Sequence, residues 1–407
     1  MEKIAEAGKK ETASDCWVHL EIKDSGGITI DLKSKVESLY GESIRNKAAE
    51  MLKFFKIKNA ALRIEDSGSL PFVLTARIEA TVKKCFPQKK EEFLAPIPQK
   101  NLYRAERERF RRSRLYVPGD QPRLIINAGL YNPDGIILDL EDAVAPSVKE
   151  SARYIVRNAL REVDFLGGER MVRINQLPMG ITDLDFVVPH GVHTVLIPKC
   201  ENADTVKEVD VHIQVLRTQH KIKDNVYLMP IIESSLGVIN AYGIATASPS
   251  TVALTIGLED FTADIGAERT LEGRESFLAR NQVVLAARAA GIQPIDSVFS
   301  DVSDEEGLKE SICEAKSLGF EGKGCIHPSQ IRIVHEGFAP SMSEINRAKK
   351  IILALEEAKK KGSGVVALGS KMIDPPVVKR AERILKLAFV NNQIPANWKE
   401  KENVEGK

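Results

Sequence analysis

Eight short runs rich in β-branched and other apolar residues alternate with amphipathic stretches over the middle of this chain, and this alternation limits its possible folds more than any other feature. The helical phase is plain in one stretch, where Ala152, Ile155, Ala159 and Leu160 recur at spacings of three and four residues. Eight strands with interspersed helices are typical of a (β/α)8 TIM barrel in the α/β class. A doubly wound open sheet shows the same alternation, but the count of eight and the lack of a G-x-G-x-x-G turn after the first run weigh against it. The expected strands cover residues 114–117, 135–139, 171–174, 194–197, 226–232, 251–256, 297–299 and 324–326.

The 407 residues divide into unequal parts. Residues 1–87 predict a small α+β domain, with strands near 17–22, 28–32, 61–65 and 72–74, and helical spacing over 44–55 and again over 77–82. Residues 88–112 carry two prolines and dense charge, which favour an exposed linker with a helix near 103–112. We expect the barrel domain over 113–390 and a charged, frayed tail without assigned function over 391–407.

Composition excludes several classes of partner. The 58 Lys and Arg residues nearly balance the 57 Asp and Glu residues, so the net charge of +1 predicts neither a nucleic-acid nor an anionic-membrane surface. No apolar run approaches the roughly 18 residues of a membrane span, and the first ten residues lack the apolar core of a signal peptide. We therefore expect a cytoplasmic protein. The five cysteines show no C-x-x-C spacing, which indicates neither a zinc knuckle nor a disulfide framework.

In a barrel of this kind, the reactive groups follow the carboxyl ends of the strands. Applied to the expected strands, this rule selects Asp139, Glu141, Asp142, Arg173, Asn175, Lys199, Glu233, Glu259, Asp260 and His327. Several acids and one arginine should therefore converge at one end of the barrel.

Glu233 and Asp260 follow adjacent strands, so their carboxylates are expected to approach a shared point. Ionised carboxylates that converge need a positive partner, and Mg2+ accepts oxygen ligands in this way. The alternative is that each acid caps the helix after its strand. Arg173 offers a planar donor fork for a carboxylate or an enolate, or else an ordinary salt bridge to Glu141 or Asp142.

Two further residues allow other chemistry. Lys199 at a strand end is placed to form a Schiff base in a metal-free aldolase, although the surrounding acids favour a protonated amine. His327 is either a base or metal ligand, or a structural histidine held by hydrogen bonds.

Several stretches then resemble one family. Residues 115–119, 138–144, 172–175, 231–233, 257–261, 322–330 and 370–376 are together similar to the citrate lyase β-subunit and to its malyl-CoA and citramalyl-CoA lyase relatives. The similarity runs in order from about 114 to 387. Residues 1–86 resemble the citrate lyase acyl carrier (γ) subunit, through 40–45, 64–70 and 73–80.

The first resemblance implies a Mg2+-dependent carbon–carbon lyase that acts on a hydroxyacyl thioester in a homotrimer or hexamer. It implies Glu233 and Asp260 as metal ligands, Arg173 as the thioester and enolate contact, Glu141 and Asp142 as an acidic pair by the metal, and Asp374 as a catalytic acid that reaches the neighbouring subunit's site.

The second resemblance implies a phosphopantetheine-type, dephospho-CoA-derived prosthetic group on Ser14, with Thr12 as the next choice. The run from Gly8 to Asp15 departs from the family's pattern, being one residue longer and lacking its paired serine. The module is therefore either a carrier or a structural, docking domain.

The resulting expectation is cleavage of a citryl thioester, bound to the carrier or to CoA, into oxaloacetate and an acetyl thioester. The attached carrier favours the citryl substrate because a tethered arm raises its effective concentration at the barrel. The alternatives are a citramalyl-CoA or malyl-CoA lyase, and a non-catalytic scaffold that binds a CoA thioester. An acyl-transferase subunit is a candidate partner.

Overall fold

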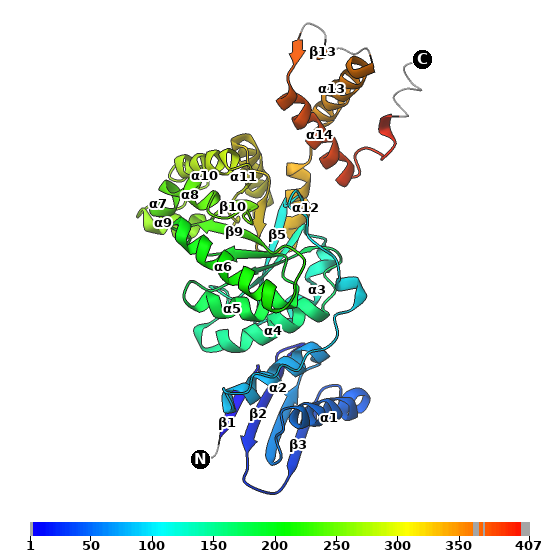
Figure 1. Cartoon of the computed structure of the whole chain (residues 1–407), viewed down its shortest axis with the longest axis vertical. Coiled ribbons are helices and arrows are strands. Elements are labelled where there is room, and N and C mark those ends of the chain that lie inside the picture. Colours follow the sequence, from blue (N-terminus) through cyan, green and yellow to red (C-terminus); the bar gives the residue numbers. More distant parts are fainter. Residues whose placement is uncertain (1–2, 361–365, 369–370, 400–407) are drawn as a thin grey trace. The chain divides into compact units, whose positions relative to one another are not determined.

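Eight short parallel strands form a barrel in the computed structural model, which describes residues 3–360, 366–368 and 371–399 (Figure 1). The chain divides into two compact units, Met1–Ile331 and Arg332–Lys407. The first unit holds the N-terminal module and the barrel. The domain boundaries expected from the sequence stay a prediction, but the division near residue 331 separates the barrel strands from the C-terminal helices.

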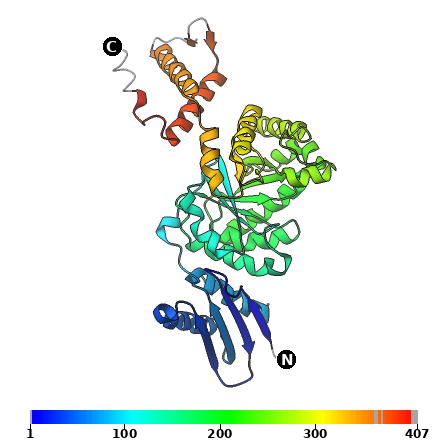
Figure 2. The same ribbon diagram turned by 180° about the vertical axis from the view of Figure 1, so that it is seen from behind.

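The N-terminal module is a four-stranded sheet with two helices against one face, as Figures 1 and 2 show. Its elements are β1 (Ile4–Ala7), β2 (Cys16–Ile22), β3 (Ile28–Ser34), α1 (Glu37–Phe54), β4 (Ala60–Asp66) and α2 (Pro71–Cys85). The strand order is β1-β2-β4-β3, with β3 and β4 parallel and the other pairs antiparallel.

One local expectation for this module was wrong, and one strand was not expected. Residues 72–74 belong to α2 and not to a strand, because Pro71 is well suited to the first turn of a helix, where no N–H is needed. The sequence reading also missed β1, a four-residue edge strand too short to show a clear period.

The segment between the module and the barrel is not a solvated helix. Residues 102–112 are irregular apart from a turn, with a 3-10 turn before them at Gln99–Asn101. Arg111 is buried and donates two hydrogen bonds, of 2.8 and 2.9 Å, to the carboxylate of the buried Glu169. The charge of Arg111 therefore belongs to a buried ion pair. The charge density of the sequence alone had predicted an exposed side chain.

The barrel confirms the expected fold class. Its strands are β5 (Ser113–Pro118), β6 (Gly135–Asp139), β7 (Glu169–Arg173), β8 (Thr194–Ile197), β9 (Tyr227–Ile232), β10 (Ala253–Ile256), β11 (Gln293–Ile295) and β12 (Lys323–Cys325). Neighbours pair in parallel, β5 pairs with both β6 and β12, and a bridge between Asp296 and Lys323 closes the ring. Apolar side chains such as Ile137, Met171 and Leu196 fill the interior.

The seventh strand lies at Gln293–Ile295 and not at the expected 297–299, and the eighth starts at Lys323, one residue earlier than expected. Pro294 argues against a strand in a sequence reading because it cannot donate to a ladder. Here β11 has a full ladder only with β10 and meets β12 through a single bridge, so the missing N–H is tolerated.

Helices surround the barrel. They are α3 (Pro122–Asn127), α4 (Lys149–Glu162), α5 (Met179–Val187), α6 (Ala203–Gln219), α7 (Ser235–Ile239), α8 (Ala241–Ala245), α9 (Leu258–Asp264), α10 (Phe277–Ala289) and α11 (Glu305–Leu318), with 3-10 turns at Ala128–Tyr131, Pro146–Val148 and Val188–His190. The next helix, α12 (Ser329–Phe338), crosses the boundary between the two units. Asn202 and Asp304 cap α6 and α11 by accepting backbone N–H groups, as the sequence chemistry of helix starts predicts.

Helix α4 is buried on both faces, because α2 of the N-terminal module packs on its outer side. Arg157 of α4 is fully buried and pairs with the equally buried Glu79 of α2 at 2.7 and 3.0 Å. Asn158 donates to the carbonyl of Phe72 and to the hydroxyl of Thr75. The polar face of an amphipathic helix thus becomes a specific docking surface for the module.

The second unit contains α13 (Met342–Lys360), the antiparallel pair β13 (Val366–Leu368) and β14 (Lys371–Ile373), and α14 (Pro375–Val390). Its core includes Ile345, Leu385, Ile394 and Trp398. The expected frayed tail is therefore packed as far as it is described, and its residues 400–407, like Ser370, lie outside the described residues. Among the residues described, no helix is long and apolar enough to cross a lipid bilayer.

Candidate active site

A cavity of about 240 Å³ opens at the carboxyl ends of the barrel strands. Its lining draws on β5, β6, β7, β9, β10 and β11 or the turns after them. The polar or charged members include Arg114, Tyr116, Asp139, Arg173, Glu233, Glu259, Asp260 and Asp296. Five of the ten groups selected by the strand-end rule thus border one space, namely Asp139, Arg173, Glu233, Glu259 and Asp260.

Arg173, the last residue of β7, is held by two carboxylates. Its Nε and Nη2 donate to Asp139 at 2.8 and 2.6 Å, and its Nη1 lies 2.9 Å from Glu141. Burial opposes the charge of the guanidinium, but the hydrogen bond and charge of Asp139 raise the pKa of Arg173 above its usual value. A guanidinium has five N–H donors, so two remain for a ligand.

The salt bridge between Arg173 and Glu141, which the sequence left open as an alternative, does form. Arg173 also has a second carboxylate partner. Asp139, and not Asp142, shares Arg173 with Glu141. Asp139 also accepts the backbone N–H groups of Glu141 and Ala143, which orients the carboxylate. Asp139 is a positioning residue to which the sequence reading gave no role.

Glu233 follows β9 and is 6% exposed. Its Oε2 accepts the backbone N–H of Lys199 at 2.9 Å, and burial raises its pKa to about 7. A Cβ atom on Gly257 would lie 2.6 Å from the Oε1 of Glu233, so the absence of a side chain at position 257 makes room for this carboxylate. The helix after β9 is capped by Ser234, so Glu233 is free of the capping role that the sequence left open.

Lys199 extends its amine among three carboxylates. Its Nζ lies 3.6 Å from Glu141, 3.5 Å from Asp142 and 3.9 Å from Asp260. Burial opposes the charge, but Glu141 and the other acids raise the pKa of Lys199. A protonated amine is a poor nucleophile, which counts against the Schiff-base alternative.

The donor set fits a hard dication. Glu233 and Asp260 present oxygen ligands to the same cavity, and the space beside them already attracts the ammonium of Lys199. Within the described ranges, no three His, Cys, Asp or Glu side chains are arranged to hold a metal by themselves. Two protein carboxylates would leave the other coordination positions to water and substrate.

The remaining predicted residues fall elsewhere. Asn175 is a structural residue whose N–H groups donate to the buried Asp183. His327 is exposed, and its Nδ1 contacts the hydroxyl and the N–H of Ser329, which favours the structural interpretation. Asp374 belongs to the second unit, where it precedes α14, and its place beside a barrel stays a prediction.

Two of the cavity residues that sequence reasoning missed come directly after β11. Asp296 follows β11 and is fully buried, where it pairs with Arg280 and Lys323. Ser297 accepts the N–H of Leu258 at 3.1 Å and so supports the turn before Asp260. Correct placement of the seventh strand would have brought both to notice, because both then follow a strand end.

A closed barrel with a clamped arginine and several acids at its carboxyl end defines a TIM-barrel enzyme for an anionic substrate. Residues 112–328 match the HpcH/HpaI aldolase/citrate lyase family, and the chain belongs to this family. Residues 275–391 match the C-C_Bond_Lyase family of the TIM-barrel fold. The chain is a carbon–carbon lyase, as the sequence predicted. Residues 3–85 match the ACP family described as malonate decarboxylase delta subunit (MdcD).

Individual proteins agree with the family assignment. The citrate lyase subunit beta of Leuconostoc mesenteroides subsp. cremoris is 41% identical over 290 residues, 70% of this chain and 96% of the relative. The mitochondrial citramalyl-CoA lyase of Mus musculus is 32% identical over 68% of this chain and 86% of the relative. The crystal structure of CitE from Mycobacterium tuberculosis with magnesium, acetoacetate and coenzyme A is 30% identical, with a TM-score of 0.54 over 70% of this chain and 99% of that one.

Proposed function

We propose that this chain is a Mg2+-dependent lyase that cleaves a citryl thioester to oxaloacetate and an acetyl thioester. The observation that carries the proposal is the arrangement of Arg173, Glu233 and Asp260 around one cavity at the carboxyl end of the barrel. The similarity to a citrate lyase β-subunit over nearly its whole length supports the citryl substrate. The similarity to a citramalyl-CoA lyase keeps the smaller substrate as the alternative.

Each residue then has a defined task. Glu233 and Asp260 would hold the ion, beside the place where the hydroxy-acid end of the substrate is expected to bind. When bound, Mg2+ supplies a Lewis acid that lowers the pKa of the substrate's hydroxyl group. A carboxylate accepts the hydroxyl proton. Burial, partly opposed by Arg173, raises the pKa of Glu141, which makes its carboxylate a stronger base for this role. Asp374 of a neighbouring subunit is the other candidate base.

Bond cleavage moves one electron pair. The carbon–carbon bond breaks as the hydroxyl carbon becomes the carbonyl of oxaloacetate, and the electrons of that bond pass to the acetyl thioester as an enolate. The two unpaired N–H groups of Arg173 are placed to stabilise the negative charge as it develops. Asp139 holds the guanidinium of Arg173 in place before the reaction, so the side chain need not move as the charge develops. A proton then converts the enolate to the acetyl thioester.

The test is release of an oxo-acid from citryl-CoA by the purified full chain, with Mg2+ and with EDTA. A dehydrogenase specific for each product identifies the acid. Oxaloacetate formed only with Mg2+ is the expected result. Pyruvate from citramalyl-CoA or glyoxylate from malyl-CoA, with no cleavage of citryl-CoA, would retain the mechanism and overturn the substrate. Cleavage that resists EDTA would overturn the metal assignment.

We further propose that the N-terminal module carries an acyl group on Ser14. Lys9, in the same loop, pairs with Asp120 at 2.7 Å, and Arg77 binds Asp15 through both carboxylate oxygens. Asp120 follows β5, so this loop lies at the end of the barrel where the cavity opens. Its position suits delivery of a tethered group to the same chain's barrel.

Intact-mass analysis tests the attachment. The chain isolated from a host with the modifying enzymes should carry one phosphopantetheine-type group, and Ser14→Ala should remove it while Thr12→Ala should not. An unmodified chain that cleaves citryl-CoA normally would favour the docking-domain alternative. The buried Arg157–Glu79 pair is the observation that supports that alternative.

The assembly expected for this function is a homotrimer or hexamer. We propose that an acyl-transferase subunit supplies the citryl group to the carrier, since a thioester must be formed before the barrel can cleave it. Light scattering of the purified chain tests the oligomer, and co-purification with a transferase tests the partner.

A further inference from the structure

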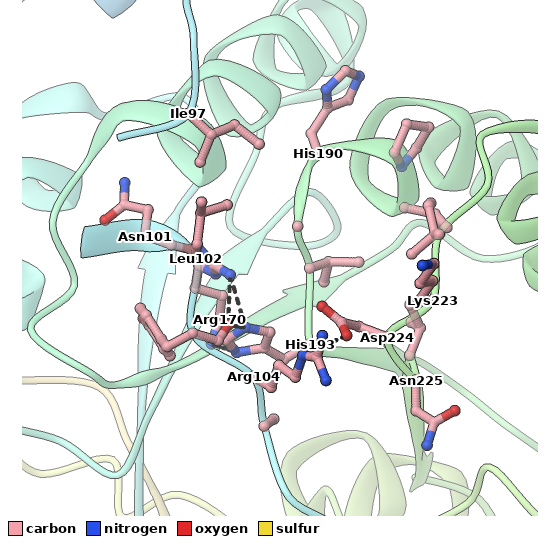
Figure 3. Close-up of a pocket in the computed structure, with 18 of the residues that line it drawn as sticks. Ile97, Asn101, Leu102, Arg104, Arg170, His190, His193, Lys223, Asp224 and Asn225 are labelled. Atoms are coloured by element: carbon pink, nitrogen blue, oxygen red, sulfur yellow. Dashed lines mark hydrogen bonds and ion pairs between the residues drawn. The ribbon is translucent and has the colours of Figure 1, made fainter. Parts of the chain in front are cut away.

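A second cavity, of about 500 Å³, lies at the amino ends of the barrel strands, opposite the candidate active site. The segment before β5 and the loops that precede β8 and β9 enclose it. Figure 3 shows Arg170 and His193 together on its wall, with Arg104 and Asp224 beside them. Its volume falls within the usual range for a small-molecule site. None of the residues assigned to the lyase reaction lines it.

Arg170 of β7 is the unusual feature of this cavity. It is 5% exposed, and no carboxylate in the described part of the chain forms an ion pair with it. Its Nη1 donates to the carbonyl of Asn101 at 2.7 Å, and its guanidinium lies 4.7 Å from the ring of Tyr103. A buried charge without a counter-charge is costly, so an anion is the expected missing partner.

The contact of Arg170 with His193 does not satisfy the guanidinium. The Nδ1 of His193 accepts the backbone N–H of Arg170 at 3.1 Å, so the proton of the neutral ring sits on Nε2. Burial, followed by the charge of Arg170, lowers the pKa of His193 to about 3 and keeps the ring neutral. Nε2 therefore donates to the carbonyl of Tyr103 at 3.0 Å and offers no lone pair to the Nη2 of Arg170, 2.8 Å away.

The guanidinium thus retains unused donors. Its Nε is also buried and has no hydrogen-bond partner among the described residues. Two further cations, Arg104 and Lys223, stand at the exposed rim, and Asp224 forms an ion pair with Arg104 at 2.6 Å. The local balance of three cations to one acid favours an anion. Apolar side chains of Leu102, Val188 and Ile222 provide walls for a larger body.

We infer that this cavity binds a small organic anion, with a carboxylate or phosphate on the fork of Arg170 and the rest of the molecule along the apolar walls. Arg170 also holds the backbone of Asn101 and Tyr103, so the bound anion would contact the segment that joins the module to the barrel. The site is independent of the proposed lyase reaction and takes no part in the chemistry.

Thermal unfolding of the full chain with EDTA tests the inference, using citrate for the carboxylate and AMP for the phosphate, each against sodium chloride of equal ionic strength. At least one probe should raise the melting temperature of the wild type in a saturable way. Arg170→Met should abolish that rise. Arg63→Met, which removes an exposed arginine from β4, should keep it.

Two more variants separate this site from the active site and from a folding defect. Arg173→Met should retain the response, since that arginine lies at the other end of the barrel. The rim variant Arg104→Met/Lys223→Met should raise the Kd about tenfold or less, because both side chains are exposed. No saturable response to either probe, a response lost with Arg173→Met, or a response unchanged in both Arg170→Met and the rim variant would overturn the inference.

Discussion

At the scale of single residues, the site depends on small clearances and on pairings between distant parts of the chain. Glu233 occupies the space left by Gly257, and Arg173 is fixed by Asp139. The sequence identified Glu233 and Arg173 because they lie at the carboxyl ends of strands. It could not identify the role of Gly257, because a close approach between side chain and backbone leaves no periodic signal.

Gly257→Ala tests this clearance. The added methyl would lie 2.6 Å from Oε1 and 2.7 Å from Cγ of Glu233, so the flexible side chain must move away. We expect kcat/KM to fall by about 100-fold, the effect of displacing a reacting group by about 1 Å, with the fold retained. Gly243→Ala is the matched control, since a Cβ there meets nothing within 4 Å. Equal activity of the two variants would contradict the assigned role of Glu233.

The lowered pKa of His193 predicts that the folded protein loses stability in acid. Burial, followed by Arg170, lowers its pKa to about 3, whereas the unfolded chain takes up the proton near pH 6.5. The native state therefore loses stability as the pH falls from about 6.5 toward 3, by about 2 kcal/mol at pH 5.

Denaturant unfolding at pH 7.5 and pH 5.0 measures this loss. His193→Asn retains an acceptor for the N–H of Arg170 and cannot titrate, so its stability should fall less between the two values. A fall as large as that of the wild type would show that His193 is not the source.

At the scale of elements, periodicity located most strands, and failures occurred where tertiary contacts override local preference. The strand β11 contains a proline, and helix α2 includes the β-branched and aromatic run that predicts a strand. Helix α4 was correctly expected as amphipathic. Its polar face is nevertheless buried, because α2 covers it with complementary charge.

The α2–α4 contact predicts the effect of removing a buried arginine. Arg157→Met should destabilise the first unit by about 3–5 kcal/mol, because Glu79 would remain buried without its partner. The double variant Arg157→Met/Glu79→Met should recover much of this loss. Denaturant unfolding of the full chain, monitored by circular dichroism, gives the order of stabilities. A double variant less stable than the single one would show that the loss in Arg157→Met does not come from the unpaired carboxylate of Glu79.

At the scale of the whole molecule, the chain combines a carrier-like module, a lyase barrel and a C-terminal unit. The family resemblance implies that Asp374, in the last of these, completes the site of a neighbouring subunit. Such a shared site makes an oligomer part of the catalytic machinery.

Subunit mixing tests this expectation. Asp374→Asn and Glu233→Ala chains should each be inactive alone, and co-refolded mixtures should regain part of the wild-type activity. Recovery arises because a mixed oligomer contains at least one site with both native residues. Mixtures as inactive as the separate variants, in oligomers shown by mass spectrometry to contain both chains, would place Asp374 in its own barrel's site or outside catalysis.

The sequence by itself determined the eightfold alternation of strands and helices and the class of barrel, because both follow from local periodicity. It also determined which end of the barrel carries Arg173, Glu233 and Asp260, because parallel strands all point the same way. Only the tertiary structure decided which acid holds Arg173 and where Lys199 places its amine. It also decided that Arg170 has no carboxylate partner within the part of the chain that the structure describes. Ion pairs and cavities depend on side chains that are distant in sequence, and their positions are fixed by packing rather than by any local pattern.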